Sequence, residues 1–489
     1  MCSWILKSPI FQALLFSSFA VSAALAQDRP NIVVFLCDDL GYGDLQCYGH
    51  QHLQTPRLNQ LAQEGIRFTD FYSAAPVCSP SRVGLLTGRS PNRAGVYDWI
   101  PPGSKPRPDG REQVHMRSSE VTIPALLKGS GYRTCMAGKW HCNSQFNSDT
   151  QPQPGDFGFD HWLATQNNAS PTHDGPVNFV RNGKPIGKVD GFSCQIVVDE
   201  TIGWLKETAN DERPFFVFMP FHEPHEPVAS PPKLVQQYMS VSQNRDEAEY
   251  FANVANVDSA VGRFMDALDE MKMRDNTLVI FTSDNGPETL KRYQRAKRSY
   301  GQPGVLRGMK LHTTEAGFRV AGIMNWPGRI AAGQTSSTAV SSLDFLPTFC
   351  RLAETETPSG VALDGIDFLP VLDGQPLVRD KPLVWAYYNA TNEHRVAMRD
   401  GKYKVLAKLS GGEVAQVQNV TNQTQTLVAD AKLTDIEIYD LREDVSESND
   451  LAADNRELVD QLRAKLEKHY RELATSSHVW PLEPSQIKK

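Results

Sequence analysis

Short apolar runs and segments of helical periodicity follow one another along most of the chain. Residues 31–36, NIVVFL, are apolar except for the first and lead into the polar, glycine-punctuated stretch 37–44. Residues 56–65 then place Leu58 and Leu61 at helical spacing and end at a glycine. A short apolar run is typical of a buried strand, whereas the helical period is typical of a helix with one apolar face. We therefore expect a strand, a loop and a helix in that order.

The same alternation predicts further elements as far as residue 286. Strand-like runs cover residues 66–72, 133–138, 214–220 and 276–286. Helical segments begin near Cys78 and cover residues 121–132, 192–209 and 247–273. Strands that alternate with helices form mostly parallel sheets with both faces covered. The predicted fold class is α/β, with a large, mostly parallel (mixed) sheet sandwiched by helices.

The pattern changes after residue 327. Residues 341–353 have the spacing of an amphipathic helix, and residues 357–380 are rich in Pro and Gly. Strand-like segments then cover residues 383–389, 394–408 and 435–441, and residues 455–474 have helical spacing. We predict a large domain over residues 27–380 and a smaller α+β subdomain over residues 381–489.

The N-terminus has the layout of a secretory signal peptide. Lys7 precedes an apolar run over residues 10–25, and residues 24–26, ALA, form an A-x-A cleavage site. We expect residues 1–26 to be removed and the mature chain to be secreted or periplasmic. An uncleaved anchor is the alternative, but the run is short for a membrane span and polar sequence follows directly. No later segment resembles a span, so stable membrane insertion is not expected.

The composition argues against some partners and singles out one cysteine. The chain has 489 residues, 40% of them hydrophobic, and a formal net charge of −7. An acidic balance without a basic stripe argues against nucleic acid as the main partner. Loss of Cys2 with the signal peptide would leave seven of the eight cysteines, so that complete pairing would still leave one free thiol. Cys78 is the candidate, and a half-disulfide or a buried structural thiol is the alternative.

Acidic and amide side chains follow two of the predicted strands. Asp38 and Asp39 come at the end of the first strand, and Asp284 and Asn285 at the end of the strand over 276–286. Ligands of such sheets bind beyond the carboxyl ends of strands, so we expect these oxygens to converge. Three carboxylates and an amide oxygen suit calcium or magnesium better than zinc. The alternative for any one of these residues is the capping of a turn or helix.

Two motifs resemble the signatures of a known enzyme family. Residues 78–89 are CSPSRVGLLTGR and residues 131–141 are GYRTCMAGKWH. With DDLGYGD, HEPHEP, SDNG and RGMK in the same order, they are similar to the formylglycine-dependent (type I) sulfatases of the alkaline-phosphatase superfamily. The resemblance covers residues 31–326 and resumes weakly at 437–452. It implies a smaller C-terminal antiparallel sheet with one helix.

The resemblance also implies a chemical role for Cys78. A formylglycine-generating maturation enzyme would recognise C-x-P-S-R in the unfolded chain and oxidise the thiol to an aldehyde, formylglycine. One hydroxyl of the hydrated aldehyde would attack sulfur, and loss of the proton from the second would release sulfate. A divalent cation, Ca²⁺ or Mg²⁺, would be held by Asp38, Asp39, Asp284, Asn285 and the modified Cys78.

Further residues take roles by the same resemblance. Arg82 would stabilise the hydrate and the metal site, and Lys139 would hold a sulfate oxygen. His141 would lie on the same side as Lys139 if the segment is extended, and it would act as the base that triggers sulfate release.

Two later motifs supply the remaining candidates. His225, in PHEP, would contact sulfate and protonate the leaving oxygen. His222 is a candidate substrate contact, with a solvated loop histidine as the alternative. Lys310, in RGMK, would be a second sulfate-binding lysine. Residues 315–317 are Glu-Ala-Gly where the family has Glu-Gly-Gly, a small departure from its pattern.

The implied function is hydrolysis of a sulfate monoester. Residues 162–192 form a polar insertion rich in Asn and Gly, which suits hydrogen bonding to sugar hydroxyls, although a simple surface loop is the alternative. This favours a sulfated saccharide over a steroid or lipid as substrate. A phosphonate or phosphate ester hydrolase on the same scaffold, and a non-catalytic protein that binds sulfated glycans, are the other functions considered.

Overall fold

Strand β1 (Asn31–Asp38) lies inside a large mixed sheet. The computed structural model describes residue 1 and residues 29–103, 105–289, 294–410 and 417–482, so residues 2–26 of the predicted signal peptide lie outside the described residues. In the described chain the sheet has eleven strands in the order β10-β2-β9-β8-β1-β7-β3-β4-β5-β6, with β11 paired to β2. The other strands are β2 (Ile66–Tyr72), β3 (Arg133–Lys139), β4 (His161–Thr165), β5 (Phe179–Arg181), β6 (Lys184–Gly187), β7 (Phe215–Pro224), β8 (Thr277–Ser283), β9 (Arg319–Asn325), β10 (Gln334–Ser336) and β11 (Val340–Ser341).

The centre of this sheet is parallel, and its register brings two strand ends together. β1 pairs in parallel with both β7 and β8, and Cys37 pairs with Ser283. The segments that follow β1 and β8 therefore leave the sheet side by side. β9 runs antiparallel to β2 and β8, and β5 runs antiparallel to β4 and β6. The prediction of a mostly parallel, mixed sheet is confirmed.

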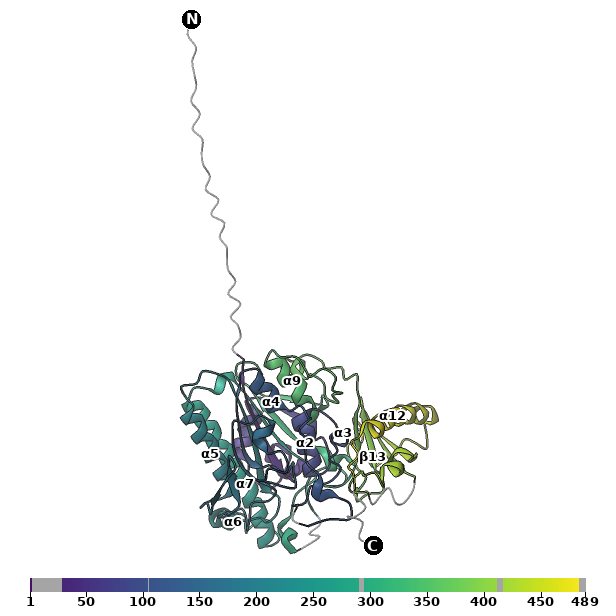
Figure 1. Cartoon of the computed structure of the whole chain (residues 1–489), viewed down its shortest axis with the longest axis horizontal. Coiled ribbons are helices and arrows are strands. Elements are labelled where there is room, and N and C mark those ends of the chain that lie inside the picture. The colour runs from purple at the N-terminus through teal and green to yellow at the C-terminus, as the bar shows by residue number, and fades with distance from the viewer. Residues whose placement is uncertain (2–28, 104, 290–293, 411–416, 483–489) are drawn as a thin grey trace.

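Helices cover both faces of the sheet, and β1 shows how the sequence divides them. Ile32 and Val34 belong to one apolar cluster, whereas Val33 and Phe35 belong to another. This alternation is the two-residue period of a strand buried on both faces. The first face is covered by α2 (Cys78–Thr87), α4 (Ile123–Gly129) and α9 (Phe345–Leu352). The second is covered by α1 (Pro56–Gln63), α5 (Ser193–Glu207), α6 (Pro232–Tyr238) and α7 (Arg245–Glu270) (Figure 1).

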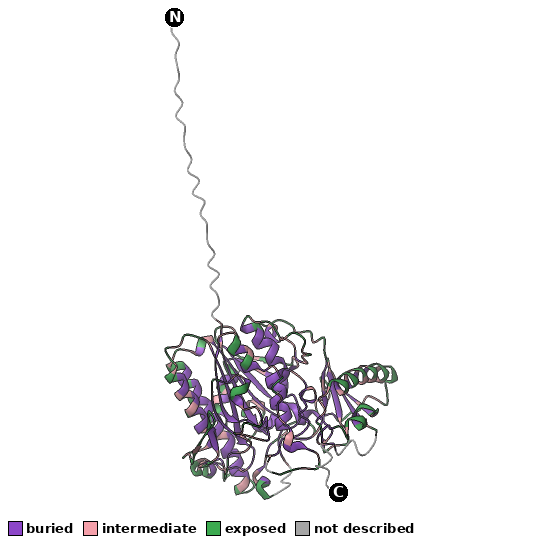
Figure 2. Ribbon diagram, in the orientation of Figure 1, coloured by how far each residue is buried: buried purple, intermediate pink, exposed green. Residues whose placement is uncertain are grey.

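A second, smaller sheet forms the C-terminal unit. Its four described strands pair antiparallel in chain order, and they are β12 (Leu383–Ala386), β13 (Val396–Asp400), β14 (Tyr403–Leu409) and β15 (Leu433–Asp440). The long helix α12 (Arg456–Ser476) packs on this sheet, and its outward face is largely exposed (Figures 1 and 2). Short helices complete the fold: α3 (Pro91–Ala94), α8 (Glu315–Phe318), α10 (Leu369–Leu372) and α11 (Gln425–Ala429). The expected smaller antiparallel sheet with a helix is confirmed, and the boundary at residue 380 stays a prediction.

Some elements were not apparent from the sequence pattern. β9 was not predicted, although it is fully buried between β2 and β8. The insertion at 162–192 is more than a surface loop, because it contributes β5 and β6 to the sheet edge. Seven cysteines are described and all are free thiols, so no disulfide forms among the described residues. No helix in the described part of the chain is long and apolar enough to cross a membrane.

Candidate active site

The acidic residues at the ends of β1 and β8 meet, as their spacing predicted. Asp39 has a left-handed backbone (φ 65°), which turns the chain just after β1. Its amide donates to Asp284 Oδ1 at 3.3 Å, and the Asn285 side-chain amide donates to Asp39 Oδ1 at 2.8 Å. Asp38 and the other three side chains of this group are buried. Parallel pairing of β1 with β8 thus places the four residues at one edge of the sheet.

This group of residues fits a hard cation. Asp38 Oδ1 and Asn285 Oδ1 are buried, and neither has a hydrogen-bond partner in the described structure. Buried polar oxygens are normally satisfied, so two such atoms at one place suit an ion that they could coordinate. One ligand atom each from Asp38, Asp39, Cys78 and His225 lies within 4.8 Å of all the others. Asp284 is not part of that set, and Arg82 donates to its Oδ2.

Burial and neighbouring charges shift the pKa values of Asp38 and Asp284 in opposite directions. Burial, followed by the charge of Asp38, raises the pKa of Asp284 to about 7. Burial also opposes ionisation of Asp38, but Lys139 and other cations hold the pKa of that carboxyl well below its usual range. A divalent cation at this place would favour the ionised form of both carboxylates.

Two lysines reach into the same group from different elements. Lys139, the last residue of β3, forms an ion pair with Asp38 Oδ2, and both side chains are fully buried. Lys310 Nζ lies 2.7 Å from Asp39 Oδ2. Burial disfavours the charged form of Lys310, yet the nearby Asp39 carboxylate raises the pKa of that ammonium well above its usual value. The two positive groups therefore lie where an anionic substrate group would be held.

Cys78 is the first residue of α2 and borders this group. It is 3% exposed, and burial raises the pKa of its thiol to about 12 even though Lys139 and Lys310 act in the opposite direction. The unmodified thiol is therefore kept protonated, because burial outweighs the local positive charge. A neutral thiol is a weak nucleophile.

Arg82 lies one turn along α2 and is completely buried. Its Nε and Nη2 donate to Asp284 Oδ2 at 2.9 and 2.7 Å, and its Nη1 donates to the carbonyl of Lys139 at 2.9 Å. One guanidinium thus links α2, β3 and the segment after β8. It positions Asp284 and neutralises part of the charge of the group.

His141 lies in the site, but the chain reaches it differently from what was expected. Its φ of 51° is left-handed, so the segment from Lys139 is not extended. Nε2 lies 2.9 Å from the carbonyl of Ile100, which requires Nε2 to donate and leaves Nδ1 with a lone pair. Nδ1 is buried without a partner in the described structure. Burial, and then Lys139, hold the pKa of His141 well below its usual value, so the ring is neutral.

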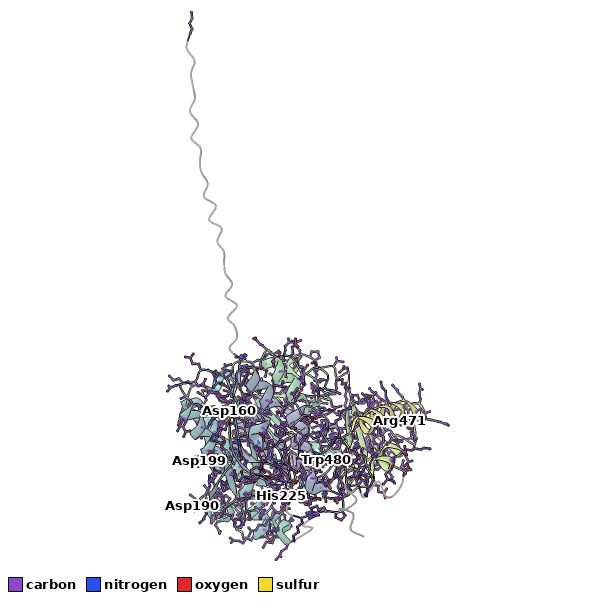
Figure 3. All side chains as sticks on the ribbon, in the orientation of Figure 1. Asp160, Asp190, Asp199, His225, Arg471 and Trp480 are labelled. Atoms are coloured by element: carbon purple, nitrogen blue, oxygen red, sulfur yellow. The ribbon has the colours of Figure 1, made fainter. Side chains whose placement is uncertain are left out.

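The two histidines of HEPHEP have different surroundings. His225 Nδ1 lies 2.8 Å from the carbonyl of Glu226, and its Nε2 lies 3.6 Å from Asp39 Oδ2. Figure 3 labels His225 among the described side chains. His222 is not a solvated loop residue, because it lies in β7 with 1% exposure and its Nε2 is 2.8 Å from Thr165 Oγ1. His225 therefore faces the acidic group directly, whereas the His222 side chain is hydrogen-bonded to Thr165 of β4.

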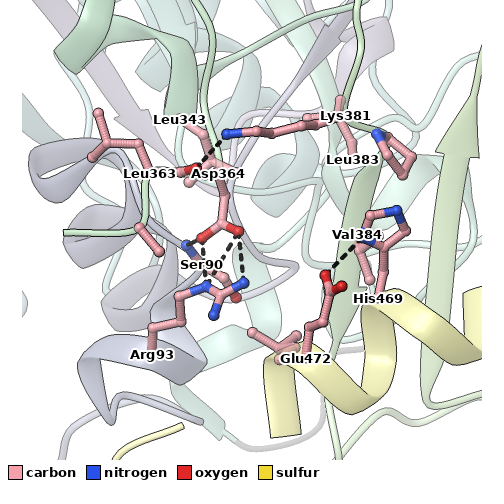
Figure 4. Close-up of a pocket in the computed structure, with 13 residues that line it drawn as sticks. Ser90, Arg93, Leu343, Leu363, Asp364, Lys381, Leu383, Val384, His469 and Glu472 are labelled. Carbon is pink, nitrogen blue, oxygen red and sulfur yellow. Dashed lines mark hydrogen bonds and ion pairs between the residues drawn. The ribbon is translucent and has the colours of Figure 1, made fainter. Parts of the chain in front are cut away.

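A separate cavity of about 250 Å³ lies between the two units (Figure 4). Its walls include Arg93, Asp364, Lys381 and Glu472. Arg93 Nε lies 2.9 Å from Asp364 Oδ2, and Lys381 Nζ donates to the carbonyl of Leu363 at 3.2 Å. None of the residues of the acidic group lines this cavity. It is a gap in the packing of the two units, and Arg93 in its wall is already paired with Asp364.

A family model described as Sulfatase matches residues 30–355. This chain belongs to the sulfatase family. Arylsulfatase A of Homo sapiens is 36% identical to it over 464 residues, which cover 88% of this chain and 85% of that protein. N-acetylgalactosamine-6-sulfatase of Canis lupus familiaris is 33% identical over 411 residues, which cover 80% and 74%. These relatives make the chain a sulfatase enzyme, which hydrolyses sulfate esters.

Solved structures agree with this assignment. The crystal structure of Ps i-CgsB matches the sulfatase with a TM-score of 0.75 and 26% identity, over 94% of this chain and 96% of that one. A phosphonate monoester hydrolase of Agrobacterium radiobacter matches with a TM-score of 0.60 and 18% identity, over 91% and 96% of the two chains. The second likeness concerns the fold alone, so the scaffold does not by itself separate sulfate from phosphonate chemistry.

The sulfatase also has residues around Cys78 that its motifs did not indicate. Asp98 is buried, and its carboxylate accepts from Tyr387 Oη at 3.0 Å and from Asn389 Nδ2 at 3.0 Å. Tyr387 and Ala390 share an apolar cluster with Cys78. The C-terminal unit therefore forms part of the wall of the site. Sequence motifs could not show this, because the partners lie about 300 positions apart and no local pattern marks Asp98.

Proposed function

We propose that this sulfatase hydrolyses the sulfate monoester of a carbohydrate, with formylglycine at position 78 and a Ca²⁺ or Mg²⁺ ion. The observation that carries the proposal is the meeting, near Cys78, of buried carboxylates with two buried lysines, together with the Oδ1 atoms of Asp38 and Asn285, which have no hydrogen-bond partner in the described structure. The hydrated aldehyde would supply two hydroxyls, one to attack sulfur and one whose deprotonation releases sulfate. The thiol itself is unsuited to the attack, because burial keeps it protonated.

The cation would be held by Asp38, Asp39, Asp284, Asn285 and the modified Cys78 side chain. It would supply positive charge for the non-bridging sulfate oxygens, which become more negative during transfer. Lys139 and Lys310 would bind the same oxygens, since their ammonium groups already lie at the acidic group. Arg82 would keep Asp284 oriented through its two hydrogen bonds.

The two histidines would act on different steps: His225 on departure of the leaving group and His141 on release of sulfate. His141 has a buried, unpartnered Nδ1 whose lone pair can take the proton of the second hydroxyl. His225 donates from Nδ1 to the Glu226 carbonyl, so in the imidazolium form its Nε2 would carry the proton that passes to the leaving oxygen. His222 would support the sulfate site from behind, through its hydrogen bond to Thr165.

A carbohydrate is the substrate class that we favour. Asp98 and Asn389 lie around Tyr387, which shares an apolar cluster with Cys78, and such polar side chains suit a hydroxylated ring better than a sterol. N-acetylgalactosamine-6-sulfatases are among the relatives, and a structure of Ps i-CgsB, 25% identical, contains k-i-k-neocarrahexaose. A steryl-sulfatase of Rattus norvegicus is 31% identical as well, so relatives alone do not decide the substrate.

Two further parts of the proposal concern maturation and location. The motif CSPSR at residues 78–82 would be recognised by a formylglycine-generating enzyme before folding, since α2 buries all five residues in the folded chain. The proposed signal peptide over residues 1–26 would direct the protein to a secreted or periplasmic location.

Turnover of 4-nitrophenyl sulfate and 4-nitrophenyl phosphate by the matured protein would test this function, with a panel of defined sulfated saccharides alongside. We expect hydrolysis of the sulfate to exceed that of the phosphate, and release of sulfate from at least one saccharide. Cys78→Ala should be inactive toward all of them. A preference for the phosphate would favour the phosphate ester alternative, and no turnover at all would favour a binding protein.

A further inference from the structure

The segment from Asp98 to Ile100 borders the reacting residues directly. The amide of Ile100 donates to Ser79 Oγ at 2.9 Å, and its carbonyl accepts from His141 Nε2 at 2.9 Å. Trp99, one residue earlier, is half-buried and packs against the apolar cluster that contains Cys78 and Tyr387. Its indole ring therefore lies at the rim of the site, beyond the place where the sulfate would sit.

Two arginines lie against this indole, and they differ in their partners. The guanidinium carbon of Arg111 lies 5.0 Å from the Trp99 ring centroid, and that of Arg107 lies 5.6 Å away. Arg111 is buried and donates to Asp98, Asp109 and Gln418. Arg107 is half-buried, and among the described residues no carboxylate lies within ion-pair distance of its guanidinium, although its backbone amide donates to Glu112 at 3.0 Å.

The loop that carries Arg107 is held in place. The amide of Gly103 donates to the carbonyl of Ser144 at 2.8 Å, and the Gln145 side chain donates to the carbonyl of Gly103 at 2.9 Å. The amide of Gly110 donates to the carbonyl of Arg107 at 3.0 Å. Prolines at 106 and 108 flank the arginine and restrict its backbone. A cation is thus fixed at the rim by an aromatic ring and by its own loop while its hydrogen-bond donors remain available.

We propose that Trp99 and Arg107 form a subsite for a second anionic group, a sulfate or a carboxylate, on the saccharide whose scissile sulfate lies at Cys78. This subsite rests on the proposed carbohydrate function and narrows it to saccharides that carry at least two negative charges. Arginine binds both anions through paired N–H donors. The indole keeps the guanidinium oriented, so less side-chain freedom is lost when the anion binds.

The test compares kcat/KM on saccharides that differ only in the second group: a neutral disaccharide with one sulfate, the same disaccharide with a second sulfate, and the same with a uronate. For the wild type we expect the doubly charged substrates to exceed the singly charged one, by on the order of tenfold or more. Arg107→Gln should abolish most of this preference through KM, while turnover of 4-nitrophenyl sulfate stays unchanged. Arg107→Lys should restore part of it.

Lys105→Gln is the matched control. Lys105 is exposed, lies in the same loop and carries the same charge, but it makes no contact with Trp99. Its loss should leave the preference nearly intact, which separates a specific subsite from general attraction to a basic loop. In Arg107→Gln, the substrate whose kcat/KM falls more, the disulfated or the uronate-containing saccharide, carries the anion that the subsite prefers.

Three results would overturn the subsite. The first is equal kcat/KM for singly and doubly charged saccharides in the wild type, and the second is an unchanged preference in Arg107→Gln. The third is turnover of 4-nitrophenyl sulfate without turnover of any saccharide, which removes the carbohydrate assignment as well. Because 4-nitrophenyl sulfate has no second anionic group to reach the subsite, its turnover reports the sulfatase chemistry alone, and a failure of that chemistry would be recognised separately.

Discussion

Lys404 Nζ lies 2.8 Å from Glu315 Oε1, and neither side chain is exposed. Lys404 belongs to β14 of the small sheet, whereas Glu315 begins α8, five residues after Lys310. Arg319 and Tyr72 also contact the Glu315 carboxylate, and the Lys404 ammonium lies 4.2 Å from the Phe318 ring centroid. The C-terminal unit thus holds the segment that presents Lys310 to the site.

Lys404→Met should therefore destabilise the protein and weaken substrate binding. It leaves the Glu315 carboxylate buried without its nearest cation, and breaking a buried pair in this way costs roughly 3–5 kcal/mol. Lys402→Met, on the same hairpin but partly exposed, should have little effect. Chemical denaturation and KM for 4-nitrophenyl sulfate are the measurements. Equal stabilities of the two variants would show that the Lys404–Glu315 pair does not hold the units together.

The same cluster predicts a pH dependence of stability. The Glu447 carboxyl group accepts a hydrogen bond from the backbone amide of Glu315 at 2.9 Å. Burial raises its pKa to about 7, with Lys404 acting against this and Glu315 adding to it. An acid whose pKa is raised by folding favours the folded state below its unfolded pKa of about 4.3, and this contribution is lost as the pH rises to 7.

The free energy of unfolding should consequently fall between about pH 4.5 and pH 7, by up to about 1.4 kcal/mol per pH unit for this one proton. Glu447→Gln keeps the hydrogen bond to the Glu315 amide and should flatten the profile in that window. Glu443→Gln, which is exposed, should keep the wild-type profile. Identical slopes in the wild type and Glu447→Gln would contradict the assignment.

The sequence motifs located the acidic group well, because its geometry follows from local order. Asp38 and Asp284 each come directly after an apolar run, and parallel pairing of those two strands is sufficient to bring them together. The alternation of strands and helices likewise predicted the central sheet. Such features depend on short stretches of sequence, whose periodicity is visible without any knowledge of distant contacts.

The parts that were missed depend on distant contacts. β9 is a short apolar run interrupted by Gly322, and a glycine inside a strand weakens the local signal; Phe71 of the neighbouring strand leaves no room there for a side chain. The left-handed turn at His141 and the partners of Asp98 arise from packing against other segments. Lys404 likewise lies in a short polar segment of the small sheet, and only the fold brings it, fully buried, to Glu315.

Removal of the divalent cation should abolish activity and lower Tm, because a ligand that binds only the folded state stabilises it. Calcium or magnesium should restore both. Asp284→Asn should lose activity at ordinary metal concentrations, whereas Asp275→Asn, exposed near the other end of β8, should behave as the wild type. Activity that survives exhaustive chelation would contradict a metal role for the acidic group.

Loss of each histidine should leave a different lesion. His225→Ala should slow sugar sulfates, whose leaving groups need a proton, far more than 4-nitrophenyl sulfate, by on the order of a hundredfold to ten-thousandfold. His141→Ala should instead let a sulfated form of the enzyme accumulate, which intact-mass spectrometry detects. His52→Ala, on the exposed surface, is the control. Equal losses on all leaving groups, with no trapped sulfate ester, would mean that the two roles are assigned wrongly.

The central claim is that position 78 acts as formylglycine, and the tryptic peptide over residues 68–82 tests it most directly. After coexpression with a formylglycine-generating enzyme, mass spectrometry of this peptide should show the aldehyde in place of the Cys78 thiol. Across preparations matured to different extents, turnover of 4-nitrophenyl sulfate should rise in proportion to the aldehyde fraction, and Cys78→Ser should be nearly inactive. Full turnover by protein whose peptide carries only the unmodified thiol would contradict the account.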